Sequence, residues 1–122
     1  MTAGIGSDHV DLQAAMDQSI TAAEVTYSNL ISVAEHAVMM IFPLVRNYIT
    51  SYQWVVKGGC NIADCVSRSY DLEGMHVGTV AAGRIGTAIL RRLARFDVHL
   101  HYFDRLRLPE AVEKELNVIF HP

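Results

Sequence analysis

The fold is indicated by one stretch, residues 77–86, which reads Val77-Gly78-Thr79-Val80-Ala81-Ala82-Gly83-Arg84-Ile85-Gly86. An apolar run ends at Val80, and a helical pattern begins at Arg84. The turn between them has the spacing Ala81-x-Gly83-x-x-Gly86. Gly83 lets the backbone approach a pyrophosphate without a Cβ in the way, and Gly86 lets the helix pack closely on the strand. The spacing therefore predicts a dinucleotide-binding turn.

Two further features favour this interpretation. The unpaired amides of Arg84 and Ile85, together with the positive end of the helix dipole, favour an anion at the helix start. Asp104 ends the next apolar run, where its carboxylate can accept hydrogen bonds from ribose hydroxyls and repel a ribose phosphate. That charge selects NAD over NADP, although the neighbouring Arg105 works against the preference. The alternative is a glycine turn and a surface aspartate in a fold that binds no nucleotide.

Position 81 departs from the usual pattern, because alanine stands where the first glycine is expected. We therefore expect Ala81 to make the turn with an ordinary backbone conformation.

Around this turn, helical and strand patterns alternate. Apolar periodicity predicts a strand over 75–80, a helix over 84–94, a strand over 98–102, a helix from Pro109 to about Leu116 and a strand over 118–120. The inward positions of the first helix are Ile85, Ala88, Ile89 and Leu93. The order predicts an α/β fold, the first half of a Rossmann-type doubly wound parallel sheet.

The amino-terminal part has weaker signals. Ser7 can cap a helix over 8–17, and the apolar content of residues 20–27 predicts a strand. Ser32-Val33-Ala34-Glu35 matches the capping box, so a long helix is expected to begin there. Its buried stripe at three-and-four spacing comprises Val33, Ala37, Met40, Ile41, Leu44, Val45 and Tyr48.

The end of this long helical region also has sequence signals. Pro43 removes an amide donor inside the helical pattern, which predicts a kink near Met39–Pro43. Gly58-Gly59 ends the helical region, and an irregular connection is expected over 60–74.

Composition bounds the class of protein. The chain has 122 residues, 51% of them hydrophobic, and a net charge of -3, which is typical of one globular domain. No apolar run is long enough to cross a bilayer, and the first residues lack the features of a signal peptide. The mild acidity argues against nucleic-acid binding. We expect a cytoplasmic chain without membrane or nucleic-acid partners.

Cysteine and histidine are not arranged as metal ligands. Cys60 and Cys65 have no second pair beside them, so free thiols are expected rather than a zinc site. His99 and His101 alternate along a strand that we expect to be buried on both faces, where packing is favoured over metal binding. We predict no metal site.

Several segments resemble NAD-dependent formate dehydrogenases, a branch of the D-2-hydroxyacid dehydrogenase superfamily. Ser32-Val33-Ala34-Glu35-His36 and the turn at 78–86 are shared with the wider superfamily. The segments characteristic of the formate branch are the motif Val25-Thr26-x-x-Asn29 and the stretch Tyr70-Asp71-Leu72-Glu73-Gly74. Further matching segments are residues 3–12 and 46–48. The resemblance runs through nearly the whole chain. Leu30, Pro43 and Cys60 depart from the family's commoner residues.

The resemblance implies hydride transfer from formate to NAD, which gives carbon dioxide and NADH. It assigns formate contacts to Asn29, whose amide can hold a carboxylate oxygen, and to Ile5. The cofactor-binding positions are Ala81, Gly83, Arg84, Ile85, Gly86 and Asp104. The implied domains are the end of the substrate domain over 1–28, a linking and dimerisation helix over 29–59, and the first half of the NAD-binding Rossmann domain over 60–122.

The family's catalytic arginine and histidine fall beyond Pro122, so we expect the isolated chain to be inactive with formate. We expect a homodimer formed through the linking helix. Two alternatives are a non-catalytic NAD-binding or dimerising module, and a fragment of another D-2-hydroxyacid dehydrogenase. In the second alternative Asn29 would be incidental.

Overall fold

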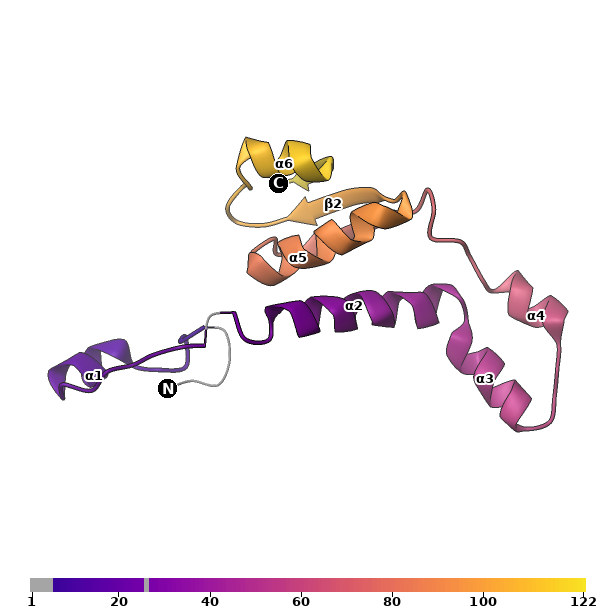
Figure 1. Cartoon of the computed structure of the whole chain (residues 1–122), viewed down its shortest axis with the longest axis horizontal. Helices are drawn as coiled ribbons and strands as arrows, with labels where there is room; N and C mark the ends of the chain where they lie inside the picture. Colours follow the sequence, from indigo (N-terminus) through magenta and orange to yellow (C-terminus); the bar gives the residue numbers. More distant parts are fainter. Residues whose placement is uncertain (1–5, 26) are drawn as a thin grey trace.

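The fold is an α/β unit preceded by a mostly helical segment, and this computed structural model describes residues 6–25 and 27–122. Ile5, one of the two predicted formate contacts, lies outside the described residues. Helix α2 runs alongside α5 in Figure 1, and the segment that carries α1 reaches beyond the amino-terminal end of α2. The helices and strands are α1 (Leu12–Asp17), α2 (Leu30–Val45), α3 (Tyr48–Val56), α4 (Ile62–Ser67), β1 (His76–Val80), α5 (Arg84–Leu93), the 3₁₀ turn η1 (Ala94–Phe96), β2 (His99–Phe103), α6 (Glu110–Leu116) and β3 (Val118–His121).

The three strands form one parallel sheet in the order β1-β2-β3. His76 pairs with His99, and Leu100 pairs with Val118. Helices α5 and α6 form the two crossovers between these strands. The predicted alternation of strands and helices is confirmed. Pro109 occupies the position before α6, where its fixed φ suits a helix start.

The core lies between one face of the sheet and the helices. Leu90, Leu93 and Tyr102 are its largest fully buried side chains, and Leu116 of α6 belongs to the same cluster. Ala88 and Leu93 are buried as predicted, whereas Ile85 and Ile89 are only partly buried. The prediction missed Leu90 because α5 is covered on two sides, by the sheet and by α2, and a single apolar stripe does not describe such a helix.

The opposite face of the sheet is open in the described chain, which contradicts the prediction that β2 is buried on both faces. His99 is exposed and His101 is partly buried, while Leu100 and Tyr102 point into the core. Parallel crossovers of the same hand place their helices on the same side of a sheet when the strand order advances in one direction, as it does here from β1 to β3. Both α5 and α6 therefore cover the face that carries Leu100.

Four histidines gather on this open face. The Nδ1 atom of His76 lies 2.7 Å from Nε2 of His101, and Nδ1 of His101 lies 2.8 Å from Nε2 of His121. His99 stacks on His76 with ring centroids 4.7 Å apart. Loss of hydration lowers the pKa of His101, and the neighbouring histidines lower it further. Over residues 6–25 and 27–122, no three histidine, cysteine or acidic side chains are placed to hold a metal ion.

The amino-terminal segment differs from its prediction. Helix α1 begins at Leu12 and is capped by Asp11, whose carboxylate accepts from the amide of Ala14 at 2.9 Å, so Ser7 is not the cap. Within the described part of the predicted strand, residues 20–25 and 27, only Glu24 has strand-type pairing, as a single bridge. Ile20 and Tyr27 are exposed rather than packed, so this segment has little buried apolar surface to stabilise a longer strand.

Helix α2 begins earlier than predicted. Its amino-terminal cap is Asn29, three residues before Ser32, the first residue of the expected capping box. The side chain of Asn29 makes no capping bond. Glu35, the acidic member of the expected box, instead pairs with Arg92 of α5 at 3.2 Å. A contact with a neighbouring helix has replaced the local capping interaction.

The bend in the helical region falls after Pro43 rather than at it. Helix α2 continues through Pro43 to Val45. Figure 1 draws α2 as one unbroken helix. Asn47 then adopts a left-handed conformation with φ 49°, and α2 and α3 meet at 66°. Asparagine tolerates this conformation better than most residues. The predicted single linking helix is therefore two helices.

The connection before β1 is more regular than predicted. Residues Ile62–Ser67 form α4, in which Asn61 caps the amide of Asp64 at 3.2 Å. Both Cys60 and Cys65 are free thiols.

No single helix in the described chain is long and apolar enough to cross a membrane. Helices α2 and α3 satisfy the length and hydropathy requirements only as a pair with the 66° bend between them. Val38 and Ile41 of α2 pack against the core of the α/β unit.

Candidate dinucleotide site

The turn after β1 is built around a strained alanine. Ala81 has φ 83°, a conformation that favours glycine, so the expectation of an ordinary backbone at this position is wrong. The amide of Ala81 donates to the carbonyl of Phe103 at 2.7 Å, which holds the turn against the end of β2. The requirement for the tight turn has thus overridden the preference of the residue.

The two glycines of the turn have different surroundings. A Cβ placed on Gly86 would lie 2.3 Å from the carbonyl oxygen of Ala81, so only glycine allows α5 to approach the turn this closely. A Cβ on Gly83 would meet no heavy atom within 4 Å. The space in front of Gly83 is therefore open. These are the two conditions that a bound pyrophosphate requires of such a turn.

Helix α5 begins at this open space. Gly83 precedes it as the amino-terminal cap and contributes no side-chain hydrogen bond. The amides of Arg84 and Ile85 in the first turn therefore have no capping oxygen from that position. Amides of this kind, together with the helix dipole, attract a phosphate group.

Asp104 reaches the turn from the carboxyl end of β2. Its Oδ2 atom accepts from the amide of Ala82 at 2.7 Å, and its Oδ1 atom accepts from the amide of Leu106 at 3.3 Å. These amides, first that of Ala82, lower the pKa of Asp104 below its usual value. A carboxylate offers about four acceptor positions, so two backbone bonds leave room for further donors.

Arg84 faces the amino-terminal segment as well as the turn. Its Nη2 atom lies 3.5 Å from Oε1 of Glu24, and its guanidinium lies 5.5 Å from the centre of the Tyr27 ring. The side chain is 41% exposed, so a solvent-borne anion can reach it. Neither Glu24 nor Tyr27 was predicted as part of the site, because nothing in their local sequence indicates a contact with a residue so distant in the chain.

Asn29 is the residue that precedes α2. Its side chain is exposed, and its neighbours Tyr27 and Leu30 line one cavity together with Arg84 and Thr87. The hydroxyl of Thr87 donates to the carbonyl of Ala82 at 2.8 Å and closes the turn. The structure thus brings the segment around Asn29 and the nucleotide turn to the same place.

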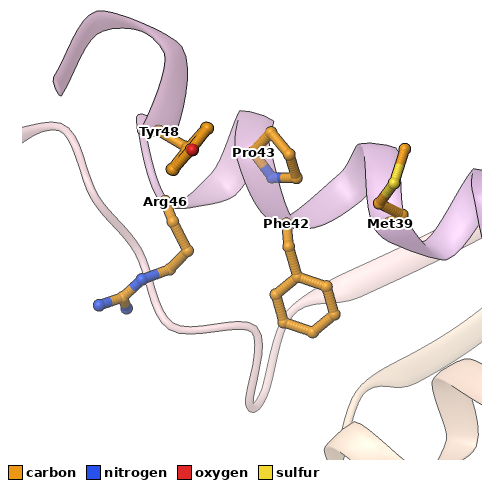
Figure 2. A pocket seen from close by; sticks show the side chains of 5 residues that line it. All are labelled: Met39, Phe42, Pro43, Arg46 and Tyr48. Carbon is orange, nitrogen blue, oxygen red and sulfur yellow. The ribbon is translucent and has the colours of Figure 1, made fainter. Parts of the chain in front are cut away.

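A second hollow lies at the other end of α2, beside the bend to α3. It has a volume of about 380 Å³ and is lined by Met39, Phe42, Pro43, Arg46 and Tyr48 (Figure 2). In the close-up the ring of Phe42 points away from the helix axis, and Arg46 lies near the first residue of α3. Its lining contains only one charged side chain and no member of the nucleotide turn.

The comparisons with known proteins agree with this geometry. Residues 38–121 match the model of the NAD-binding domain of the D-isomer specific 2-hydroxyacid dehydrogenases, and the chain belongs to that family. NAD is accordingly the cofactor of the family's domain that this chain represents in part.

Within this family, the chain is similar to several formate dehydrogenases. The formate dehydrogenase of Pseudomonas sp. (strain 101) is 74% identical over 121 residues, which are 99% of this chain and 30% of that protein. The structure of a Granulicella M. formate dehydrogenase superposes with a TM-score of 0.90 at 69% identity, covering 98% of this chain and 32% of that one. The NAD-dependent formate dehydrogenase of Staphylococcus aureus in complex with NAD gives a TM-score of 0.79 at 38% identity, covering 99% and 35%.

The chain therefore spans about a third of the length of the relatives it matches.

Proposed function

We propose that this chain is the part of an NAD-dependent formate dehydrogenase that contains the first half of the NAD-binding domain. The enzyme would transfer the hydride of formate to the nicotinamide ring of NAD, leaving carbon dioxide and NADH. The observation that carries the proposal is the 74% identity to a formate dehydrogenase over nearly the whole chain. The open, glycine-lined start of α5 is consistent with the cofactor.

Each predicted site residue has a role in this proposal. Gly83 would admit the pyrophosphate, Arg84 and the amide of Ile85 would neutralise it, and Asp104 would accept from the adenosine ribose. Gly86 and Ala81 would shape the turn. NAD supplies the hydride acceptor, while the protein residues supply position and charge.

Asn29 and Ile5 would serve the substrate. The amide of Asn29 can donate to one formate oxygen, because formate offers only acceptors to the protein. Formate has no hydroxyl proton to lose, so such a site must mainly orient the C–H bond toward the cofactor in a water-poor pocket. The cavity that Tyr27 and Leu30, close to Asn29 in the chain, line together with Arg84 supports this role.

We also propose the domain division 1–28, 29–59 and 60–122 for the complete enzyme. Helices α2 and α3 would form the linking region and a homodimer interface. Their exposed apolar side chains support that role, and they include Met39, Met40, Leu44, Ile49 and Val55. Sedimentation of the chain would test the dimer, with replacement of Leu44 and Val55 by serine expected to yield monomers. We expect a cytoplasmic location without nucleic-acid or membrane partners, which cell fractionation would test.

The first experiment on the proposed site is a calorimetric titration of the purified chain with NAD. Saturable binding is expected, and an Asp104→Ala variant is expected to bind more weakly because its carboxylate is absent. A folded chain that binds no NAD would contradict the cofactor site. The isolated chain is expected to produce no NADH from formate above a buffer control, because these 122 residues span only about a third of the length of the enzymes they match.

A second experiment tests the substrate. A chimera joins residues 1–122 to the missing parts of the Pseudomonas enzyme, and its NADH production is measured with formate and with D-lactate. Formate is expected to be the better substrate, and Asn29→Ala is expected to reduce its turnover. Preference for D-lactate, with no effect of Asn29→Ala, would favour another D-2-hydroxyacid dehydrogenase.

A further inference from the structure

Arg84 has an anionic partner within the chain. The carboxylate of Glu24 lies 3.5 Å from its guanidinium, on the side of the amino-terminal segment. The separation is at the long end for an ion pair, and the side chains of Arg84 and Glu24 are 41% and 27% exposed. Pairs with this degree of exposure are weak and exchange readily. The guanidinium can therefore be drawn to a stronger anion.

Glu24 has a partner besides Arg84. Its Oε2 atom accepts a hydrogen bond from the amide of Gly6 at 2.7 Å. This bond joins the two ends of the segment 6–24, which includes α1. Glu24 can therefore give up Arg84 and stay bound within its own segment.

We propose that Glu24 is an internal anion that holds Arg84 in the nucleotide-free chain, and that the pyrophosphate of the dinucleotide competes with Glu24 for this guanidinium. The inference rests on the proposed cofactor site and adds a residue that limits its affinity. A dinucleotide pyrophosphate carries two negative charges and lies, in this proposal, directly at the first turn of α5. Glu24 carries one charge and approaches from the side of Tyr27.

This competition links the cofactor to the amino-terminal segment. Arg84 contacts both Glu24 and Tyr27, so it ties residues 24–27 to the start of α5. When the pyrophosphate draws Arg84 away, that tie weakens. Nucleotide binding would thereby release the segment that precedes Asn29, and the substrate and cofactor sites would be energetically coupled.

The test is a calorimetric titration of the chain with NAD in four forms: wild type, Glu24→Gln, Arg84→Gln and the double variant. Glutamine removes the charge but keeps an oxygen that can accept from Gly6. Glu24→Gln is expected to tighten binding by about twofold to fivefold at low salt, the range for an exposed ion pair. In the Arg84→Gln background the same change should have no effect, because Glu24 acts through Arg84.

Glu35→Gln is the matched control. Glu35 of α2 forms a comparable exposed pair with Arg92 of α5, away from the nucleotide turn. This variant should bind NAD like the wild type. The gain from Glu24→Gln should also shrink in high salt, which screens charges.

The outcomes separate this inference from the proposed function. If the wild type binds NAD and Glu24→Gln binds it equally well or more weakly, the proposed competition is wrong and the cofactor site is still supported. A gain of the same size in the Arg84→Gln background would also overturn it. Absence of binding by both the wild type and Glu24→Gln would overturn the competition and the cofactor site together.

Discussion

Gly86→Ala is the substitution for which the structure gives the clearest magnitude. The new Cβ would lie 2.3 Å from the carbonyl oxygen of Ala81 and 3.1 Å from its carbonyl carbon. An ordinary contact distance of about 3.4 Å requires the turn or the helix to move by about 1 Å. The atoms that the new Cβ would meet belong to the backbone of Ala81, whose amide donates a hydrogen bond to the carbonyl of Phe103. The turn therefore cannot move without disturbing β2.

Overpacking of this kind costs about 1–3 kcal/mol, and the better helix propensity of alanine returns up to about 1 kcal/mol. We take the upper end of the cost because the clash is with backbone, and expect a net loss of about 2 kcal/mol in the free energy of unfolding. Urea unfolding followed by circular dichroism measures this loss as a lower midpoint.

Gly83→Ser is the matched control for this experiment. Gly83 has open space around its Cβ position and a φ of -64°, and serine is a preferred residue at a helix amino-terminal cap. Its stability should stay within about 0.5 kcal/mol of the wild type, while NAD binding weakens because the new side chain fills the approach to the turn. Equal midpoints for Gly86→Ala and Gly83→Ser would refute the steric reasoning.

Three further predictions concern the turn and the core. Ala81→Gly should raise the melting temperature in a calorimetric scan, because relief of about 1–2 kcal/mol of strain exceeds the roughly 0.5–1 kcal/mol entropic cost of glycine. Asp104→Asn should destabilise the chain near neutral pH, and the difference should vanish in acid. The reason is that the Ala82 amide lowers the pKa of Asp104, so the wild type loses this stabilisation as the pH falls below about 3.8 and through that pKa. Tyr102→Phe should lower the free energy of unfolding by about 1–2 kcal/mol in urea, because the Leu108 amide, which donates to the Tyr102 hydroxyl at 2.9 Å, loses its acceptor.

The sequence was sufficient for the α/β unit because its signals there are local and agree with one another. The apolar run before Val80, the glycine spacing and the helical pattern after Arg84 all indicate the same turn. Each strand of the sheet lies within one residue of its predicted bounds, since a short apolar run flanked by turn residues defines a buried strand well.

The sequence was not sufficient where a distant residue decides the outcome. Ser32 and Glu35 match the local sequence pattern of a capping box, but in the structure Glu35 forms an ion pair with Arg92 of α5. The exposure of His99 depends on which face of the sheet the crossovers cover, and no local pattern contains that information. The positive φ of Ala81 follows from the close approach of α5 at Gly86, a tertiary constraint that overrides residue preference.

The pairing of the sheet has a consequence for how the unit forms. Each strand joins the strand that comes next in the chain, as His76 with His99 and Leu100 with Val118. The loops to be closed are therefore short, and the entropic cost of closing a loop grows with its length. Pairing between consecutive strands thus keeps the contact order of this parallel sheet lower than pairing between more distant strands would, which favours faster folding than such an arrangement. During synthesis, the three-stranded unit can assemble once β3 has left the ribosome.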